Sequence, residues 1–523
     1  MLDLIIKNGK IIDGTGKAPI EADLGIKGKQ ITEIGNLKPG SARKTIDAKG
    51  NFVAPGFIDI QNHSDSYWTI FDYPHQESML LQGITTILMG HCGASLAPLP
   101  SLEAVKAVQK WHTLEGKNLN WQYFDEYLNE LDKRDLGTNT GSLIGHSTVR
   151  RGLMGDATRK ITAAELKVLR RITSNSLEAG AFGLSVGLVY AHEFHTTLEE
   201  LSLLAGEVKK FHGLLSVHLR SEGGQVLESM DEILRLAKEA EVRTKISHLK
   251  IRGHKNYHQF EQLLNKLEDA YQRGTKIYFD VYPYLTSWSV LYIYLPKWAF
   301  DGGRAELLKR LRQPYMRKKI LDSLKEQSVD LSNVVVATAT SSPHLVGRTL
   351  GDIAVDQGTS THEALLNLIT ATESEIVVFD QNIASELMLE LLKHPLSMIA
   401  TDGAGLDVSA GQTSRNLVHP RCFGTMPRFL SLCLRKKLLP PEKMIYKITG
   451  MPAGLMGLAD RGVLKAGASA DVVVFDPDEI KDLATLLNPY QPPAGISWVL
   501  VNGQITVEEG RLTNTWAGKV LKA

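Results

Sequence analysis

Four residues whose side chains can bind a metal or move a proton each stand at the end of an apolar, strand-like run. They are Cys92, His218, His248 and Asp402. A thiolate combined with two imidazoles suits Zn²⁺, and three protein ligands leave room for water at a catalytic zinc site. A carboxylate beside such a site can take a proton from water and later deliver it to a leaving amine. The pattern therefore predicts a metal-dependent enzyme, with Asp402 as its acid–base residue.

A fifth strand-like run ends at His63, which could bind a second metal ion or orient a substrate. Taken one at a time, these residues have ordinary structural explanations, because a histidine can be a hydrogen-bonded core residue and an aspartate can cap the next helix. His218 and His248 are 30 residues apart, the length of one strand–helix unit, so both can point inward from adjacent strands. Their combination with Cys92 and Asp402 is what favours a metal site.

Residues beside the histidine segments are candidates for binding the substrate. Lys250 shares a strand face with His248 at the two-residue period. Its cation could meet a substrate carboxylate, although a solvated lysine at a strand end has the same pattern. Tyr282 could contact the substrate or pack in the core, and Arg220 and Glu222 could pair near the site or at the surface. We take Lys250, Tyr282 and Arg220 as the candidate substrate-binding residues.

Strand-like runs alternate with helical stretches through the middle of the chain. Apolar residues recur at helical spacing over 163–178, 222–240 and 259–272. Candidate strands fall near residues 56–62, 85–91, 141–147, 182–189, 214–219, 244–249, 276–282 and 396–401. Strand–helix alternation with eight strands predicts an α/β fold, a TIM (β/α)8 barrel, whose active site lies at the carboxyl ends of the strands.

The two ends of the chain differ from this middle part. Residues 1–54 and 461–523 contain short strands separated by Gly, Asn and Pro, and we expect them to pair into one small β-sandwich. The barrel would then span 55–460. The gap before its last strand is longer than one crossover requires, so we expect an inserted subdomain at about 285–345, which could act as a lid.

The composition is that of an ordinary globular enzyme. The 523 residues are 43% hydrophobic and 22% charged, enough for a large α/β domain with an accessory domain. A formal net charge of +1 indicates neither a nucleic-acid nor a membrane partner. The amino terminus lacks a basic signal-peptide start, and no apolar run approaches the roughly 20 residues of a membrane helix. The three cysteines contain no Cys-x-x-Cys pair, which favours a reducing, cytoplasmic location.

Several segments, in this order, are similar to one protein family. They are Ala54-Pro55-Gly56-Phe57-Ile58-Asp59, Gly90-His91-Cys92-Gly93, His218-Leu219-Arg220-Ser221-Glu222, Ser247-His248-Leu249-Lys250, Asp280-Val281-Tyr282-Pro283-Tyr284, Thr401-Asp402-Gly403 and His419-Pro420-Arg421-Cys422-Phe423-Gly424-Thr425. Over nearly its whole length the chain resembles the N-acyl-D-amino-acid deacylase (D-aminoacylase) family of the metal-dependent amidohydrolase superfamily. The resemblance implies a TIM barrel with a β-sandwich and one zinc ion held tightly by Cys92, His218 and His248. It also implies that Asp402 acts as general base and then as general acid.

The first barrel strand departs from the family pattern. The family usually has His-x-His there, with both histidines serving a second metal position, but this chain has Gln61-Asn62-His63. An amide oxygen is a poor zinc ligand beside an imidazole. We therefore expect the second position, left with His63 and Asp402, to be weak or empty. His91 stands where the family more often has asparagine, and the sequence leaves open whether it compensates for Gln61.

The resemblance implies zinc-dependent hydrolysis of the amide bond of N-acyl-D-amino acids. The partner would be a small molecule whose free carboxylate meets Lys250 and Tyr282. One alternative is a cyclic-amide hydrolase of the dihydroorotase or hydantoinase kind, although those enzymes usually bridge their metals with a carboxylated lysine where this chain has Cys92. The other is a non-catalytic homologue, marked by Gln61. The sequence leaves the side chain, the acyl group and the oligomeric state open.

Overall fold

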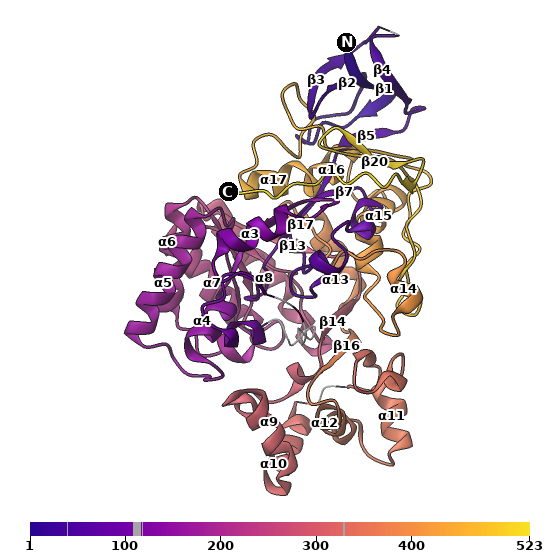
Figure 1. Cartoon of the computed structure of the whole chain (residues 1–523). Coiled ribbons are helices and arrows are strands. Elements are labelled where there is room, and N and C mark those ends of the chain that lie inside the picture. Colours follow the sequence, from indigo (N-terminus) through magenta and orange to yellow (C-terminus); the bar gives the residue numbers. More distant parts are fainter. Residues whose placement is uncertain (39, 108–116, 118, 328–329) are drawn as a thin grey trace.

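Strands from both ends of the chain pair with one another, as the sequence predicts. In the computed structural model, which describes residues 1–38, 40–107, 117, 119–327 and 330–523, they form a nine-stranded sheet at one end of the molecule (Figure 1). The order is β21-β20-β19-β18-β5-β1-β2-β3, with β4 beside β1. The ends are linked where β5 pairs antiparallel with β18, so that Ala54 lies opposite Val473. The strands are β1 (Leu2–Ile11), β2 (Ile20–Lys27), β3 (Gln30–Gly35), β4 (Ala42–Asp47), β5 (Phe52–Pro55), β18 (Val472–Phe475), β19 (Ile496–Val501), β20 (Gln504–Glu508) and β21 (Arg511–Leu512).

The middle of the chain contributes parallel strands in two sheets, ordered β6-β7-β8 and β9-β10-β11-β12-β13-β17. They fall at the eight positions expected from the sequence, because β8 and β9 are two parts of one expected strand, separated by Leu143. A parallel bridge between Asn62 and Gly403, and a 2.8 Å bond from the Asp402 N–H to the Gln61 carbonyl, join the segments that follow β6 and β17. The strands are β6 (Phe57–Asp59), β7 (Ile84–Met89), β8 (Asn139–Ser142), β9 (Ile144–Gly145), β10 (Gly183–Gly187), β11 (Leu214–His218), β12 (Arg243–Ile246), β13 (Ile277–Val281) and β17 (Ser397–Ile399).

Amphipathic helices follow the central strands. They include α5 (Ala163–Glu178), α6 (Leu198–Lys210), α7 (Val226–Ala240) and α8 (Phe260–Gln272). In α7, Val226, Met230, Ile233 and Ala237 recur every three or four positions and are buried, which is the stripe that packs a helix onto a core. Sequence periodicity places the start of this helix at 222. The helix instead begins four residues later, after Gly223 and Gly224, which are poor helix formers, and Glu222 lies in the site described below.

The segment between β13 and β17 forms a subdomain with its own hydrophobic core. Its antiparallel sheet has the order β14-β16-β15, and Figure 1 shows its helices α9 to α12 at the end of the molecule opposite the terminal sheet. Because the central strand β16 comes last in the chain, the subdomain reaches Gln381, beyond residue 345. Its elements include β14 (Thr286–Val290), η4 (Leu291–Tyr294), α9 (Gly303–Arg312), α10 (Pro314–Glu326), β15 (Val335–Ala339), α11 (Leu350–Asp356), α12 (Thr361–Ala371) and β16 (Ile376–Gln381).

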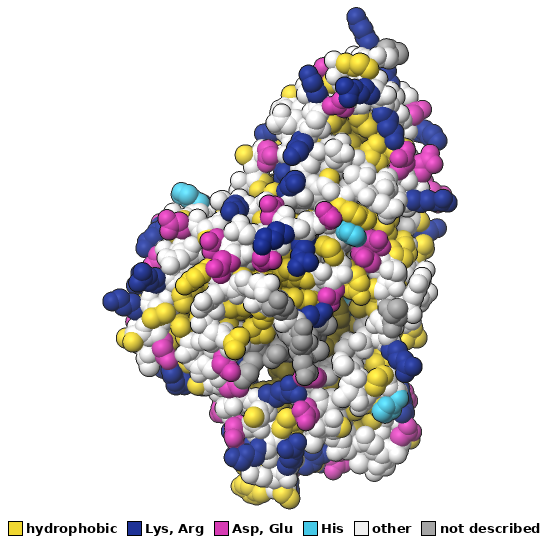
Figure 2. All heavy atoms as spheres, in the orientation of Figure 1, with side chains coloured by type: hydrophobic (Ala, Val, Ile, Leu, Met, Phe, Trp, Pro, Cys, Tyr) yellow, Lys and Arg dark blue, Asp and Glu magenta, His cyan; other side chains and the backbone are white. Residues whose placement is uncertain are grey.

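The visible surface carries a mixed charge pattern. Figure 2 shows lysine and arginine side chains interspersed with aspartate and glutamate, in keeping with a formal net charge of +1. Within the described residues, no helix combines the length and apolar character needed to cross a membrane.

Candidate metal centre and active site

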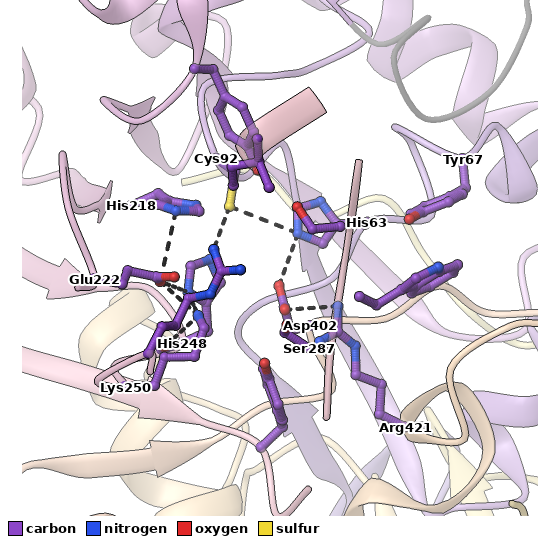
Figure 3. Close-up of a pocket in the computed structure, with 16 residues that line it drawn as sticks. His63, Tyr67, Cys92, His218, Glu222, His248, Lys250, Ser287, Asp402 and Arg421 are labelled. Atoms are coloured by element: carbon purple, nitrogen blue, oxygen red, sulfur yellow. Dashed lines mark hydrogen bonds and ion pairs between the residues drawn. The ribbon is translucent and has the colours of Figure 1, made fainter. Parts of the chain in front are cut away.

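The residues expected to bind metal and move protons come together at the carboxyl ends of the parallel strands (Figure 3). His218 is the last residue of β11, while Cys92, His248 and Asp402 come just after β7, β12 and β17, and His63 just after β6. The φ angles of Cys92, His248 and Asp402 are 55°, 38° and 48°. This left-handed region costs an L-residue energy and is found disproportionately at functional sites. The backbone is therefore strained at three of these five positions.

Cys92, His218 and His248 form a buried cluster that fits a zinc ion. One potential ligand atom from each lies within 4.8 Å of the others, and the Cys92 Sγ is 3.4 Å from the His248 Nε2. Among the described residues, neither ring nitrogen of His218 has a hydrogen-bond partner. A buried polar group without a partner costs free energy, which a bound metal would recover. A thiolate with two imidazoles is also a known zinc donor set.

The surroundings of this cluster favour the metal-binding form of Cys92 and of His218. Burial would raise the pKa of the Cys92 thiol, but the adjacent histidine rings outweigh it and hold that pKa well below its usual range. The thiolate is the form of cysteine that binds metals. Burial, helped by the neighbouring His248, lowers the pKa of His218. Its ring is therefore neutral, which is the form in which imidazole binds a metal.

Asp402 lies between two basic side chains. Its Oδ1 is 3.1 Å from the His63 Nε2, and its Oδ2 is 2.8 Å from Arg421 Nη2 at the start of α15 (Arg421–Lys436). Burial would raise the pKa of this carboxyl, but Arg421, His248 and His63 hold it well below its usual range. Burial would lower the pKa of His63, but the contacts to Asp402 and Cys92 raise it to about 10. Asp402 is therefore ionised and able to accept a proton.

The side chain of Gln61 reaches the same cluster but presents its NH₂ group to it. The Nε2 atom lies 3.4 Å from both Cys92 Sγ and Asp402 Oδ1. The Oε1 atom faces away and accepts hydrogen bonds from Lys245 Nζ at 2.5 Å and Ser247 Oγ at 3.0 Å. A lysine ammonium can only donate, so the amide oxygen must face Lys245. Gln61 therefore turns no lone pair toward the position where the family's second metal would sit.

Glu222 connects one of these histidines to Lys250. The Lys250 Nζ donates to Glu222 Oε1 at 2.6 Å and lies 2.9 Å from the His248 Nδ1. The same carboxylate oxygen is 3.1 Å from that ring nitrogen. Lys250 is buried at the pocket, as Figure 3 shows, and is not a solvated lysine. Sequence reasoning left Glu222 between a surface pair and the site, and the structure places it in the site.

The expectation that Arg220 binds substrate is corrected by the structure. Its Nε and Nη2 donate to the Glu232 carboxylate at 3.0 and 2.8 Å, and its Nη1 donates to the Phe194 carbonyl at 2.8 Å. Arg220 is also not among the residues that line the pocket. Its guanidinium therefore ties α7, through Glu232, to the segment before α6, through the Phe194 carbonyl.

The pocket above the cluster is lined by aromatic and cationic side chains. Tyr282 forms part of its wall, and the inserted subdomain contributes Trp288 and other residues of β14 and η4. Arg252 and Arg421 also line it, and sequence reasoning assigned neither a role. Arg421 lies in the His-Pro-Arg segment of the family resemblance, and Arg252 continues the two-residue alternation that begins at His248. These two sequence patterns could have identified Arg421 and Arg252 as candidate pocket residues.

Comparison with known proteins agrees with this geometry. A model of the amidohydrolase family matches residues 44–321 and 349–507. The sequence is 30% identical over 521 residues, 99% of this chain and 97% of the relative, to a D-aminoacylase of Alcaligenes xylosoxydans xylosoxydans. The fold matches an N-acyl-D-glutamate deacylase of Bordetella bronchiseptica, complexed with zinc and a phosphonate mimic of the tetrahedral intermediate, with a TM-score of 0.83 and 30% identity over 100% of both chains. It matches a D-aminoacylase studied for one-metal activation and second-metal attenuation of its binuclear centre, with a TM-score of 0.83 and 29% identity over 100% of both chains.

The fold and the cluster of thiol, imidazoles and carboxylate define a metal-dependent amidohydrolase of the class that acts on linear amides. Within that class, the chain belongs to the D-aminoacylase, or N-acyl-D-amino-acid deacylase, family.

Proposed function

We propose that this protein hydrolyses the amide bond of N-acyl-D-amino acids with a single tightly held zinc ion. The observation that carries the proposal is the buried cluster of Cys92, His218 and His248 with an ionised Asp402 beside it. Membership of the D-aminoacylase family supports the reaction, and the amide orientation of Gln61 supports one metal. The parallel strands would close into a barrel over 55–460, flanked by a β-sandwich from 1–54 and 461–523.

The chain's own residues divide the chemistry among them. Cys92, His218 and His248 would hold the zinc, with His63 and Asp402 left at the weak second position. When bound, zinc lowers the pKa of water toward about 7 and polarises the acyl carbonyl. Asp402 accepts the proton of the attacking water and passes it to the leaving nitrogen. Arg421 keeps the Asp402 carboxylate ionised and in place through the 2.8 Å contact.

Three cations at the pocket support a substrate with a free carboxylate. They are Lys250, Arg252 and Arg421. Two guanidinium nitrogens of Arg421 and one of Arg252 are buried without a hydrogen-bond partner among the described residues. Guanidinium groups bind carboxylates through paired, charge-assisted hydrogen bonds. We therefore add Arg421 and Arg252 to Lys250 and Tyr282 as the residues that receive the substrate carboxylate.

A cyclic-amide hydrolase remains the second candidate because hydantoinases share the fold. The match to an L-hydantoinase has a TM-score of 0.57 at 16% identity. In those enzymes a carboxylated lysine usually bridges the metals, and here Cys92 stands at that place. The cationic pocket also suits the free carboxylate of a linear substrate.

The test is release of free amine from a panel of N-acetyl-D- and N-acetyl-L-amino acids by the zinc-loaded protein. We expect turnover of D-substrates, selective over their L-enantiomers. Turnover of hydantoins or dihydropyrimidines in place of the linear panel would overturn the proposal in favour of the second candidate. Zinc binding without any turnover would identify a non-catalytic homologue.

A further inference from the structure

A buried hydrogen-bond chain connects Gln61 to His91, two residues of the metal-site segments that differ from the usual family pattern. Ser247 Oγ donates to Gln61 Oε1 at 3.0 Å and lies 3.1 Å from Ser216 Oγ, which lies 3.2 Å from His91 Nδ1. All four side chains are buried. Each serine has one proton to donate. Because Ser247 donates its proton to Gln61, Ser216 must donate to Ser247. The Ser216 oxygen then accepts a hydrogen bond from the Nδ1–H of His91.

The oxygen of Gln61 is held from a second direction by a buried ion pair. Lys245 is 0% exposed, and its ammonium contacts both the Asp280 carboxylate and Gln61 Oε1, the latter at 2.5 Å. Rotation of the amide would set its NH₂ group against the Lys245 ammonium, which has no lone pair to accept a hydrogen bond. The same rotation would remove the acceptor that Ser247 needs. The orientation of Gln61 is therefore fixed by two donors at once.

The fixed amide directs its two N–H bonds into the metal cluster. Nε2 lies 3.4 Å from Cys92 Sγ and 3.4 Å from Asp402 Oδ1. With His63, these two groups form the second set of potential ligand atoms, all within 4.8 Å of one another. A second metal ion at that set would need lone pairs of Cys92 and Asp402, and the amide N–H bonds of Gln61 point toward those atoms. A donor group there also carries a partial positive charge, which repels a cation.

We propose that Gln61, locked by Lys245 and Ser247, takes the place of a second metal ion by donating hydrogen bonds to Cys92 and Asp402, and so restricts this site to one metal. Gln61 is a positioning residue in this scheme. The inference rests on the proposed function only in requiring that Cys92, His218 and His248 bind zinc. The number of metal ions bound per chain is measured without substrate. A wrong metal count and an absence of deacylase activity are therefore separate results.

The test compares the wild-type chain with Gln61→Glu. This change keeps one oxygen for Lys245 and Ser247 and replaces only the NH₂ group by a second oxygen, facing Cys92 and Asp402. Each protein is equilibrated with excess Zn²⁺, freed of unbound metal by gel filtration and analysed by mass spectrometry for zinc per chain. We expect one zinc in the wild type and two in Gln61→Glu, with the second bound roughly tenfold or more tighter than in the wild type. Gln259→Glu makes the same change outside the pocket and should retain one zinc.

Either of two results overturns the proposal. One is a second stoichiometric zinc in the wild type, which needs no variant to observe. The other is a folded Gln61→Glu protein that still holds one zinc. The Co²⁺-loaded proteins give an independent readout, because loss of an N–H donor to the sulfur should shift the thiolate-to-cobalt charge-transfer band in Gln61→Glu and leave it unchanged in Gln259→Glu. An unshifted band would contradict the assigned hydrogen bond to Cys92.

Discussion

Glu222 Oε1 lies 3.1 Å from the Nδ1 of His248, at the edge of the ring opposite the Nε2 that faces Cys92 at 3.4 Å. A carboxylate beside the far nitrogen of a ligating histidine helps to orient the ring, so that its other nitrogen faces the metal position. The same oxygen is 2.6 Å from Lys250. Glu222 therefore orients a candidate metal ligand and neutralises a candidate substrate-binding cation at once.

Replacing Glu222 by glutamine should weaken zinc binding while leaving the fold intact. The neutral amide no longer offers His248 and Lys250 a negative charge, and loss of such a partner typically reduces metal affinity about 10- to 100-fold. Competition with a chelator measures the change. Glu232→Gln, which affects the outer pair with Arg220, is the matched control and should retain wild-type affinity. Equal affinities in the two variants would remove Glu222 from this role.

Cys92→Ala should lose zinc and activity together. The variant removes the thiolate ligand, and two imidazoles alone hold zinc far more weakly than a site with three protein ligands. Cys433→Ala removes another buried free thiol, one whose pKa burial raises to about 12 and which is therefore not a thiolate at neutral pH. The control should keep one zinc per chain. Stoichiometric zinc in Cys92→Ala would refute the ligand assignment.

Asp402→Asn should abolish turnover without removing the zinc. The amide cannot accept the proton of the attacking water, and loss of a general base typically costs 10²- to 10⁴-fold in kcat. Asp407→Asn changes a carboxylate five positions along the chain that does not line the pocket, and should leave kcat close to wild type. Zinc content and kcat are measured on the same preparations. Near-normal kcat in Asp402→Asn would mean that another group moves the proton.

The sequence predicts that Cys92, His218 and His248 come together, because the information for this is local. An apolar run that ends in Cys92 or His248 shows both the strand and the chemistry at its end, and parallel strands bring such ends together. The pairing of the two chain ends follows from the same kind of local pattern, here short strands broken by glycine, asparagine and proline.

Partner choice is not local, and here sequence reasoning stopped. Arg220 and Glu222 are two residues apart, yet Arg220 pairs with Glu232 while Glu222 pairs with Lys250. The orientation of the Gln61 amide depends on Lys245, which is 184 positions away in the chain. The inserted subdomain extends past residue 345 because its central strand is contributed last. None of these contacts produces a periodic pattern in the amino-acid sequence.

Arg252→Gln should raise KM for substrate more than it lowers kcat. The guanidinium lines the pocket, and its contacts to Asp380 at 3.5 Å and Tyr294 at 3.4 Å are long, so it can bind a substrate carboxylate without breaking a strong pair. One charge-assisted hydrogen bond contributes about 1.5–3 kcal/mol, which corresponds to a KM increase of roughly tenfold or more. Arg220→Gln removes a cation outside the pocket and should leave KM unchanged. The opposite ranking would restore Arg220 as the substrate-binding residue.

Stability should decline at alkaline pH through His146. Its two ring nitrogens lie 2.6 Å from Glu193 and 2.9 Å from Glu200, and all three side chains are buried. Burial would lower the pKa of this histidine, but the two carboxylates raise it from 6.5 to about 9. The folded pKa of His146 lies above the unfolded one. Its contribution to the free energy of unfolding is therefore complete below about pH 6.5 and is lost as the pH rises through about 9. Urea unfolding of the zinc-loaded protein between pH 6 and 9.5 should show this loss, and His146→Gln should lack that part of the slope. Identical slopes in the two proteins would show that His146 is neutral when folded.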